Sequence, residues 1–179
     1  MKKLGTILLI DDDEICSYLN KVLIDDLQVA EKVECIYDSE AALDYLEKAC
    51  SAQSGETTLC PDLIFLDINM PGLNGFEFLD QLKKMHSCNA LAEERVIMLT
   101  TSMHPLDMEL ASRHKVYSYL VKPLTETKVS ALVNQFLSLQ SDKVSVKQGI
   151  AANTGFKNRI PLERPKAEAS KEHNKRNEA

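Results

Sequence analysis

The sequence has no apolar run long enough to cross a membrane, and its cysteines form no metal-binding pattern. The apolar run Thr6–Ile10 follows two lysines, but it is too short for a signal-peptide core and acids follow it. The five cysteines are odd in number, scattered and without a CxxC pair, and none has a His or second Cys at ligand spacing. We therefore expect a cytoplasmic protein with reduced cysteines and no zinc site.

Positive charge is scarce over most of the chain. The formal net charge is -6, yet residues 141–179 carry nine Lys or Arg against five acids, so residues 1–140 are strongly acidic. An acidic body disfavours non-specific binding of nucleic acid to its surface, and it favours cationic partners or a metal ion among clustered carboxylates.

The chain does contain five alternations of a short apolar run with a helical pattern. The first run is followed by apolar residues at helical spacing, which predict an amphipathic helix: Ile15, Tyr18, Leu19, Val22 and Leu23. Further runs begin near residues 33, 62, 95 and 116, and each is followed by a similar pattern. Ser39 is placed to cap the second helix, and Pro105 suits the first turn of the fourth.

This alternation predicts an α/β fold with a five-stranded, doubly wound parallel sheet and five helices. Strands as continuously apolar as "ILLI" and "LIFL" are typical of parallel strands covered on both faces. We expect one domain over residues 3–139. Because the apolar periodicity stops after Gln140, residues 140–179 are predicted to be a disordered basic tail, in which "FKNRIPL" is a short segment able to dock on a surface.

Polar residues end four of the predicted strands, where a doubly wound sheet binds ligands. They are Asp11 and Asp12, Asp67, Thr100 with Thr101, and Lys122 before Pro123. Clustered carboxylates repel one another unless a cation lies among them, and oxygen ligands favour Mg²⁺. One carboxylate could then accept a phosphoryl group, with a lysine and a hydroxyl neutralising the phosphoryl oxygens.

Each of these residues also has a purely structural interpretation. The acids from Asp11 to Glu14 could cap the following helix, and we assign Asp13 and Glu14 to that role. Asp67 could start an Asx turn, Thr100 could be an ordinary strand residue, and Lys122 could be a solvated lysine. Their coincidence at one edge of the sheet favours the functional interpretation.

In its motifs the chain resembles the receiver domain of two-component response regulators, over residues 3–139. The resemblance depends on "ILLIDDDE", "DLIFLDINMPGLNGFEFL", "VIMLTTS" and "YLVKPL", in that order. It implies the strand order 2-1-3-4-5 of flavodoxin-like folds. It also implies a stand-alone, single-domain regulator that works in a phosphorelay.

The resemblance further implies roles for individual residues. Asp67 would accept a phosphoryl group from a sensor histidine kinase. Mg²⁺ would be held by Asp11, Asp12, Asp67 and the main-chain carbonyl of Asn69.

The remaining implied roles concern the response to phosphorylation. Lys122 would pair with the phosphoryl group, and Thr100 would move to hydrogen-bond it. Tyr119 would turn inward as Thr100 moves, which would change how the fourth helix, fifth strand and fifth helix bind a downstream protein. The family often has a Gly-Ala pair where this chain has His114 and Lys115.

The resemblance implies a protein that does not convert a separate substrate. It would catalyse only its own phosphorylation and dephosphorylation, as a monomer or a phosphorylation-dependent dimer, without a membrane partner. Alternatives are a phosphorelay intermediate or phosphate sink, and nucleic-acid binding through the basic tail. A haloacid-dehalogenase-type hydrolase normally needs a second Asp two residues after the nucleophile, where this chain has Asn69.

Overall fold

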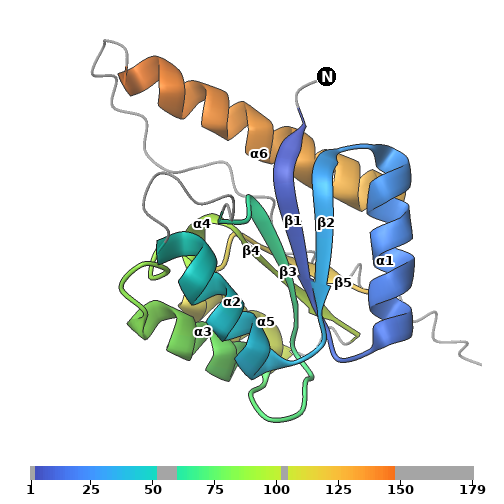
Figure 1. Cartoon of the computed structure of the whole chain (residues 1–179), viewed down its shortest axis with the longest axis vertical. Helices are drawn as coiled ribbons and strands as arrows, with labels where there is room; N and C mark the ends of the chain where they lie inside the picture. Colours follow the sequence, from blue (N-terminus) through green and yellow to red (C-terminus); the bar gives the residue numbers. More distant parts are fainter. Residues whose placement is uncertain (1–2, 52–59, 102–104, 148–179) are drawn as a thin grey trace, which may run out of the picture.

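The computed structural model describes residues 3–51, 60–101 and 105–147, and these form a parallel five-stranded sheet with helices on both faces (Figure 1). The strand order is β2-β1-β3-β4-β5, and every neighbouring pair is parallel. The strands are β1 (Leu4–Ile10), β2 (Ala30–Ile36), β3 (Leu63–Asp67), β4 (Val96–Thr100) and β5 (Ser118–Val121). The predicted fold class and strand order are confirmed.

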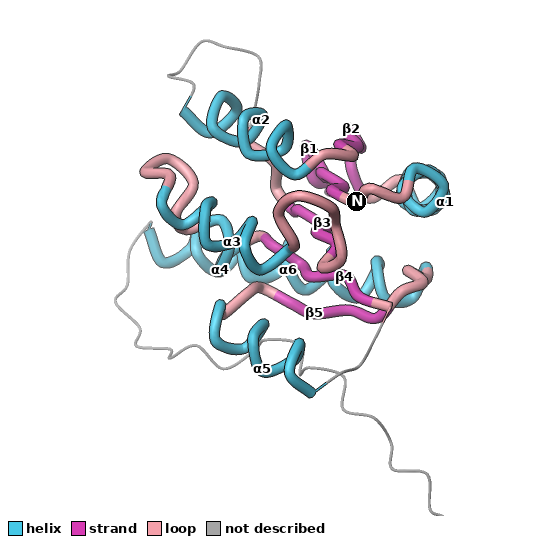
Figure 2. Tube along the Cα trace, turned by 90° about the horizontal axis from the view of Figure 1, so that it is seen from below, coloured by secondary structure: helices cyan, strands magenta, loops and turns pink. Residues whose placement is uncertain are grey.

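Two apolar cores lie on opposite faces of the sheet because successive strand residues point to opposite sides. Leu8 and Ile10 of β1 belong to one core, and Ile7 and Leu9 belong to the other. Helices α2 (Ser39–Ser51), α3 (Gly75–Lys84), α4 (Leu91–Glu94) and α5 (Pro105–His114) cover the first core, whereas α1 (Glu14–Leu27) and α6 (Glu126–Lys147) cover the second. Figure 2 shows α2 and α3 on one side of the strands and α1 on the other.

The helices differ from the predicted set in two places. A sixth, one-turn helix, α4, lies in the stretch expected to be a loop before β4. Helix α6 continues past residue 140 to Lys147, so the first residues of the predicted tail are helical. The rest of that predicted tail, 148–179, including "FKNRIPL", lies outside the described residues.

Helix α1 is amphipathic as predicted, but its most apolar stripe faces outward. Ile15, Tyr18 and Leu19 are 74%, 63% and 61% exposed. The buried residues of α1 are the polar Ser17 and Asn20 and the apolar Ile24. The helix instead packs on the sheet through Ile24, Leu23 and Leu27, which belong to or contact the second core, so the predicted stripe is exposed apart from its last residue, Leu23.

The expectation that all cysteines are reduced is wrong for two of them. Cys50, at the end of α2, and Cys60, before β3, form a disulfide, whereas Cys16, Cys35 and Cys88 are free. The two sulfur atoms meet because α2 runs back along the sheet to the end where β3 begins. Sequence spacing alone does not reveal this proximity.

The second helix is capped by the residue before the one predicted. The Asp38 carboxylate accepts a hydrogen bond from the Ala41 amide at 2.7 Å, so Asp38 is the cap. Ser39 is instead buried, and its hydroxyl accepts a hydrogen bond from the Leu73 amide. At α1 the predicted capping role of Asp13 is confirmed, because its side chain accepts from the Ile15 and Cys16 amides.

None of the helices in the described part of the chain combines the length and the apolar character that a membrane span requires.

Candidate functional site

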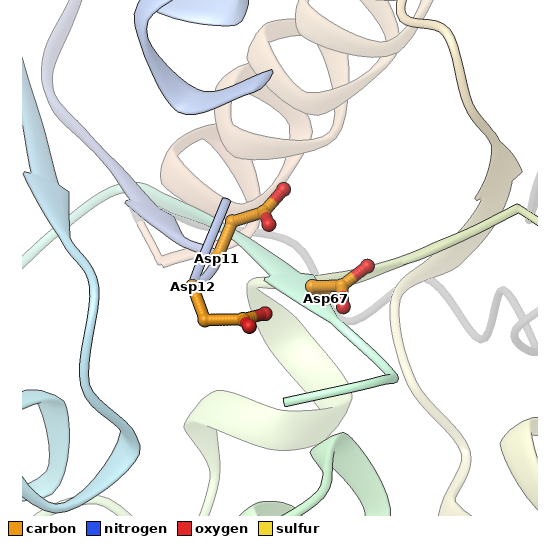
Figure 3. A group of neighbouring side chains, drawn as sticks. All are labelled: Asp11, Asp12 and Asp67. Carbon is orange, nitrogen blue, oxygen red and sulfur yellow. The ribbon is translucent and has the colours of Figure 1, made fainter. Parts of the chain in front are cut away.

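Three carboxylates meet at the carboxyl edge of the sheet. Asp11 and Asp12 follow β1, and Asp67 is the last residue of the neighbouring strand β3. One oxygen of each side chain lies within 4.8 Å of the others, and Figure 3 shows the three side chains around a common space. Asp11 and Asp67 are buried, whereas Asp12 is exposed, so the pocket opens to solvent beside Asp12.

The ammonium group of Lys122 joins two of these carboxylates. Its Nζ atom lies 2.7 Å from Oδ2 of Asp11 and 2.7 Å from Oδ1 of Asp67. Lys122 reaches this position because it directly follows β5, and its amide donates a hydrogen bond to the carbonyl of Thr100 at the end of β4. The following Lys122–Pro123 bond is cis, a form that is rare except before proline.

Burial and charge act against each other in this pocket. Burial raises the pKa of Asp11, although the hydrogen bond from Lys122 opposes the rise. Burial alone would lower the pKa of Lys122, but its hydrogen bonds to Asp11 and Asp67 outweigh this and raise it. Lys122 is therefore a fixed positive charge at neutral pH, as a group that must neutralise an anion requires.

The turn after β3 holds Asp67 in place. The Asn69 amide donates a hydrogen bond to Oδ2 of Asp67 at 2.8 Å. Gly72 has φ +77°, a left-handed conformation that favours glycine. The chain then turns so sharply that a Cβ on Gly75 would lie 2.6 Å from the carbonyl oxygen of Asp67, so only glycine fits there. Helix α3 therefore begins in close contact with the end of β3.

Thr100 and Tyr119 form a buried pair on adjacent strands. Thr100 ends β4, and Tyr119 lies on β5; they are 0% and 3% exposed. Burial raises the pKa of Tyr119, and a side-chain hydrogen bond with Thr100 opposes that rise. The two residues to which the family resemblance assigns switch roles are thus in direct contact, and both are buried.

The donor set suits a hard divalent cation. All three side chains offer carboxylate oxygens, which are the ligands that Mg²⁺ prefers. When all three are ionised, the single Lys122 ammonium leaves two negative charges uncompensated, and a divalent cation would balance them. The exposed Asp12 leaves room for the water ligands that Mg²⁺ retains.

The structure brings together most of the residues selected from the sequence. Asp11, Asp12, Asp67 and Lys122 share one pocket, and the Asn69 amide contacts Asp67. Thr100 lies at the same edge, one strand away. Sequence reasoning missed the exposed apolar stripe of α1 beside this pocket, because helical spacing shows which residues share a face but not which way that face points.

A doubly wound parallel sheet with an acidic pocket and a lysine at its carboxyl edge defines the receiver class of signalling domains. Residues 7–134 match the family described as the response regulator receiver domain. The chain therefore belongs to this family, whose members act in phosphorelay signalling as phosphoacceptors. Receiver domains generally bind Mg²⁺ at an acidic pocket, and this chain has an Asp cluster at the carboxyl edge of its sheet.

Similar proteins come from archaea and bacteria. A probable methanogenesis regulatory protein, FilR2, of Methanothrix harundinacea is 33% identical over 66% of this chain and 72% of its own length. The nitrate/nitrite response regulator NarL of Escherichia coli is 33% identical over 67% of this chain. The chain spans only 49% of NarL, so the activity of that whole protein is not carried over.

Solved structures agree with the fold. A two-component response regulator from Cytophaga hutchinsonii is 34% identical, with a TM-score of 0.66 over 76% of this chain and 99% of that one. The bacteriophytochrome response regulator AtBRR is 26% identical, with a TM-score of 0.61 over 76% of this chain and 94% of that one. Response regulator relatives of this kind imply that the chain interacts with histidine kinases and downstream targets.

Proposed function

We propose that Asp67 accepts a phosphoryl group from the phosphohistidine of a sensor kinase, and that this changes the protein surface read by a downstream protein. The observation that carries the proposal is that Asp11 and Asp12 after β1 and Lys122 after β5 meet Asp67 at the end of β3. A purely structural role explains each residue singly, but it does not explain why costly like charges share one pocket.

The chemical step is a displacement at phosphorus. A carboxylate oxygen of Asp67 forms a bond to phosphorus, the N–P bond of the phosphohistidine breaks, and the imidazole leaves with the electron pair. Lys122 is positioned to neutralise the charge on the phosphoryl oxygens, because its Nζ atom already lies 2.7 Å from Oδ1 of Asp67. Asn69 holds the other carboxylate oxygen through its amide and so orients the nucleophile.

Asp11, Asp12 and Asp67 would hold Mg²⁺, together with the main-chain carbonyl of Asn69. When bound, the ion supplies electrostatic stabilisation of the transferred group. Asp11 is oriented for this role by the Asp13 amide, which donates a hydrogen bond to its Oδ1 at 3.1 Å. With these groups the domain would catalyse its own phosphorylation and dephosphorylation.

The kinase would dock on the outward apolar stripe of α1, defined as Ile15, Tyr18, Leu19 and Val22. Transfer requires the donor imidazole to contact Asp67, so the donor protein must cover the surface around the pocket. Helix α1 begins two residues after Asp12, which places its first turn at the rim. Exposed apolar side chains there favour a protein partner with an apolar face, such as a helical domain carrying the histidine.

A downstream protein would recognise the phosphorylated state through the surface of α5, β5 and α6. Thr100 would move toward the phosphoryl group, and its partner Tyr119 links that movement to β5. On the neighbouring helix α5, Leu106 and Leu110 are 60% and 36% exposed, and they provide an apolar contact for a downstream protein. We place this signalling in the cytoplasm, as the sequence led us to expect.

Phosphotransfer from purified, autophosphorylated sensor kinases tests the proposal. At least one kinase should transfer its radiolabelled phosphoryl group to the wild-type chain within minutes, and none should label Asp67→Asn. Tyr18→Ser combined with Leu19→Ser should slow transfer from that kinase at least tenfold, while phosphorylation by acetyl phosphate stays unchanged. Equal slowing with both donors would contradict docking on the α1 stripe, and labelling of Asp67→Asn would refute the phosphoacceptor assignment.

A further inference from the structure

A groove of about 680 Å³ lies between α2 and α3, on the face of the sheet opposite α1. One wall is acidic: Glu40, Asp44 and Glu47 follow one another along α2 and are all exposed. Among the described residues, no cation forms an ion pair with any of the three. This wall is therefore a row of uncompensated negative charges.

The groove also offers apolar contact. Leu43 of α2, Leu73 of the turn before α3, and Met85 after α3 line it, and all three are half-buried. Leu43 and Met85 pack against the core beneath, so they form a fixed floor. Lys84 is the one lysine on the lining, which leaves the acids in excess. An occupant that fits must combine apolar side chains with positive charge.

We propose that this groove binds the chain's own basic C-terminal region through the segment Phe156–Leu162. The segment reads "FKNRIPL", so it alternates apolar Phe156, Ile160 and Leu162 with the cations Lys157 and Arg159. The apolar side chains would contact the floor, and the two cations would pair with the acids of α2. The proposal does not depend on phosphoryl transfer at Asp67.

Eight residues, 148–155, connect α6 to the segment. Helix α6 ends at Lys147, on the side of the molecule where α2 also ends (Figures 1 and 2). From there to Phe156 an extended chain spans at most about 30 Å, comparable to the width of such a domain. Because groove and segment belong to one chain, docking proceeds at a high effective concentration, and weak individual contacts suffice.

The acidic pocket at the carboxyl edge is a poorer site for the same segment. Two of its carboxylates, on Asp11 and Asp67, already pair with Lys122, and both are buried. The groove instead presents exposed acids above an apolar floor. It therefore matches both the charge and the apolar character of Phe156–Leu162.

Nitrogen-15 NMR spectra of the full chain test the proposal. The variant Lys157→Glu with Arg159→Glu should shift the backbone amide signals of the groove, notably those of Leu43, Leu73 and Met85. Phe156→Ser with Ile160→Ser should shift the same signals. In the wild type, raising the salt concentration should move them in the same direction, since ion pairs are screened.

The matched control is Lys171→Glu with Lys175→Glu, which makes the same change in charge farther along the chain. It should leave the groove signals in place. Unchanged groove signals in both test variants, or equal shifts in the control, would overturn the proposal. Shifts that disappear on tenfold dilution would also overturn it, because they would show that the groove binds a second copy.

Discussion

Gly75 lies so close to Asp67 that a Cβ atom on it would be 2.6 Å from the carbonyl oxygen of Asp67. The Gly75 amide donates a hydrogen bond to the carbonyl of Ile68, so the start of α3 closes directly on the end of β3. The backbone that carries the phosphoacceptor candidate is thereby fixed by the residue eight positions later.

Gly75→Ala should therefore damage both stability and phosphorylation. The closest obstructing atom is a backbone oxygen, so the start of α3 must move, at a cost of about 1–3 kcal/mol in the free energy of unfolding. Phosphorylation by acetyl phosphate should slow at least tenfold. Gly72→Asn is the control, because a Cβ there meets only Ser39 Oγ at 3.7 Å and Asn tolerates a positive φ. Equal effects of both changes would contradict this explanation.

Magnesium should stabilise the folded chain. The three carboxylates carry more negative charge than Lys122 neutralises, so Mg²⁺ should raise the melting temperature. At a free Mg²⁺ concentration of ten times its Kd, the free energy of unfolding should increase by about 1.4 kcal/mol. Asp12→Asn should lose most of this increase. Asp26→Asn, an exposed acid at the far end of α1, should keep it. An identical magnesium response in all three proteins would mean that the ion binds elsewhere.

His114 should make the protein less stable in mild acid. Burial lowers the pKa of His114 below 6.5, and the Lys83 ammonium, 3.4 Å from its Nδ1 atom, lowers it further, although Asp80 at 3.7 Å acts in the opposite sense. Near and below pH 6.5 the unfolded chain therefore binds more protons at this residue, so stability falls as the pH decreases from 7 toward the folded-state pKa.

Chemical unfolding between pH 7.5 and 5.5 measures this effect. His114→Gln should lose less stability over that range than the wild type. His86→Gln, which changes an exposed histidine, should behave as the wild type does. A steeper loss in His114→Gln would show that protonated His114 is favourably paired in the folded state.

The Cys50–Cys60 disulfide should make stability depend on reductant. It closes a short loop, with a sequence separation of 10, and constrains the unfolded chain by roughly 2–3 kcal/mol. Thiol titration of the unreduced, denatured protein should find only Cys16, Cys35 and Cys88. A phosphine reductant should lower the free energy of unfolding of the wild type but not of Cys50→Ser with Cys60→Ser. Five free thiols and no effect of reductant would contradict the disulfide.

Much of the fold and pocket follows from local sequence. Continuously apolar runs ending in Asp11, Asp67 or Lys122 are enough to predict parallel strands and to place these residues at one edge. The contact between Thr100 and Tyr119 was foreseen only through the family resemblance, because neither residue is unusual in a strand.

Other features depend on tertiary packing. The spacing of Ile15 and Tyr18 predicts that they share a face, but the orientation of α1 on the sheet decides that this face is exposed. Similarly, Cys50 and Cys60 become neighbours only through the path of the chain from α2 to β3. Local patterns contain no information about either outcome.

Intact-mass analysis after incubation with acetyl phosphate and Mg²⁺ tests the role of Asp67 most directly. The wild type should gain the mass of one phosphoryl group, and hydroxylamine should remove it, as expected for an acyl phosphate. Asp67→Asn should gain nothing, although its melting curve shows a folded protein. A wild type that gains no mass, or an Asp67→Asn variant that gains as much as the wild type, would contradict the assignment of Asp67 as the phosphoacceptor.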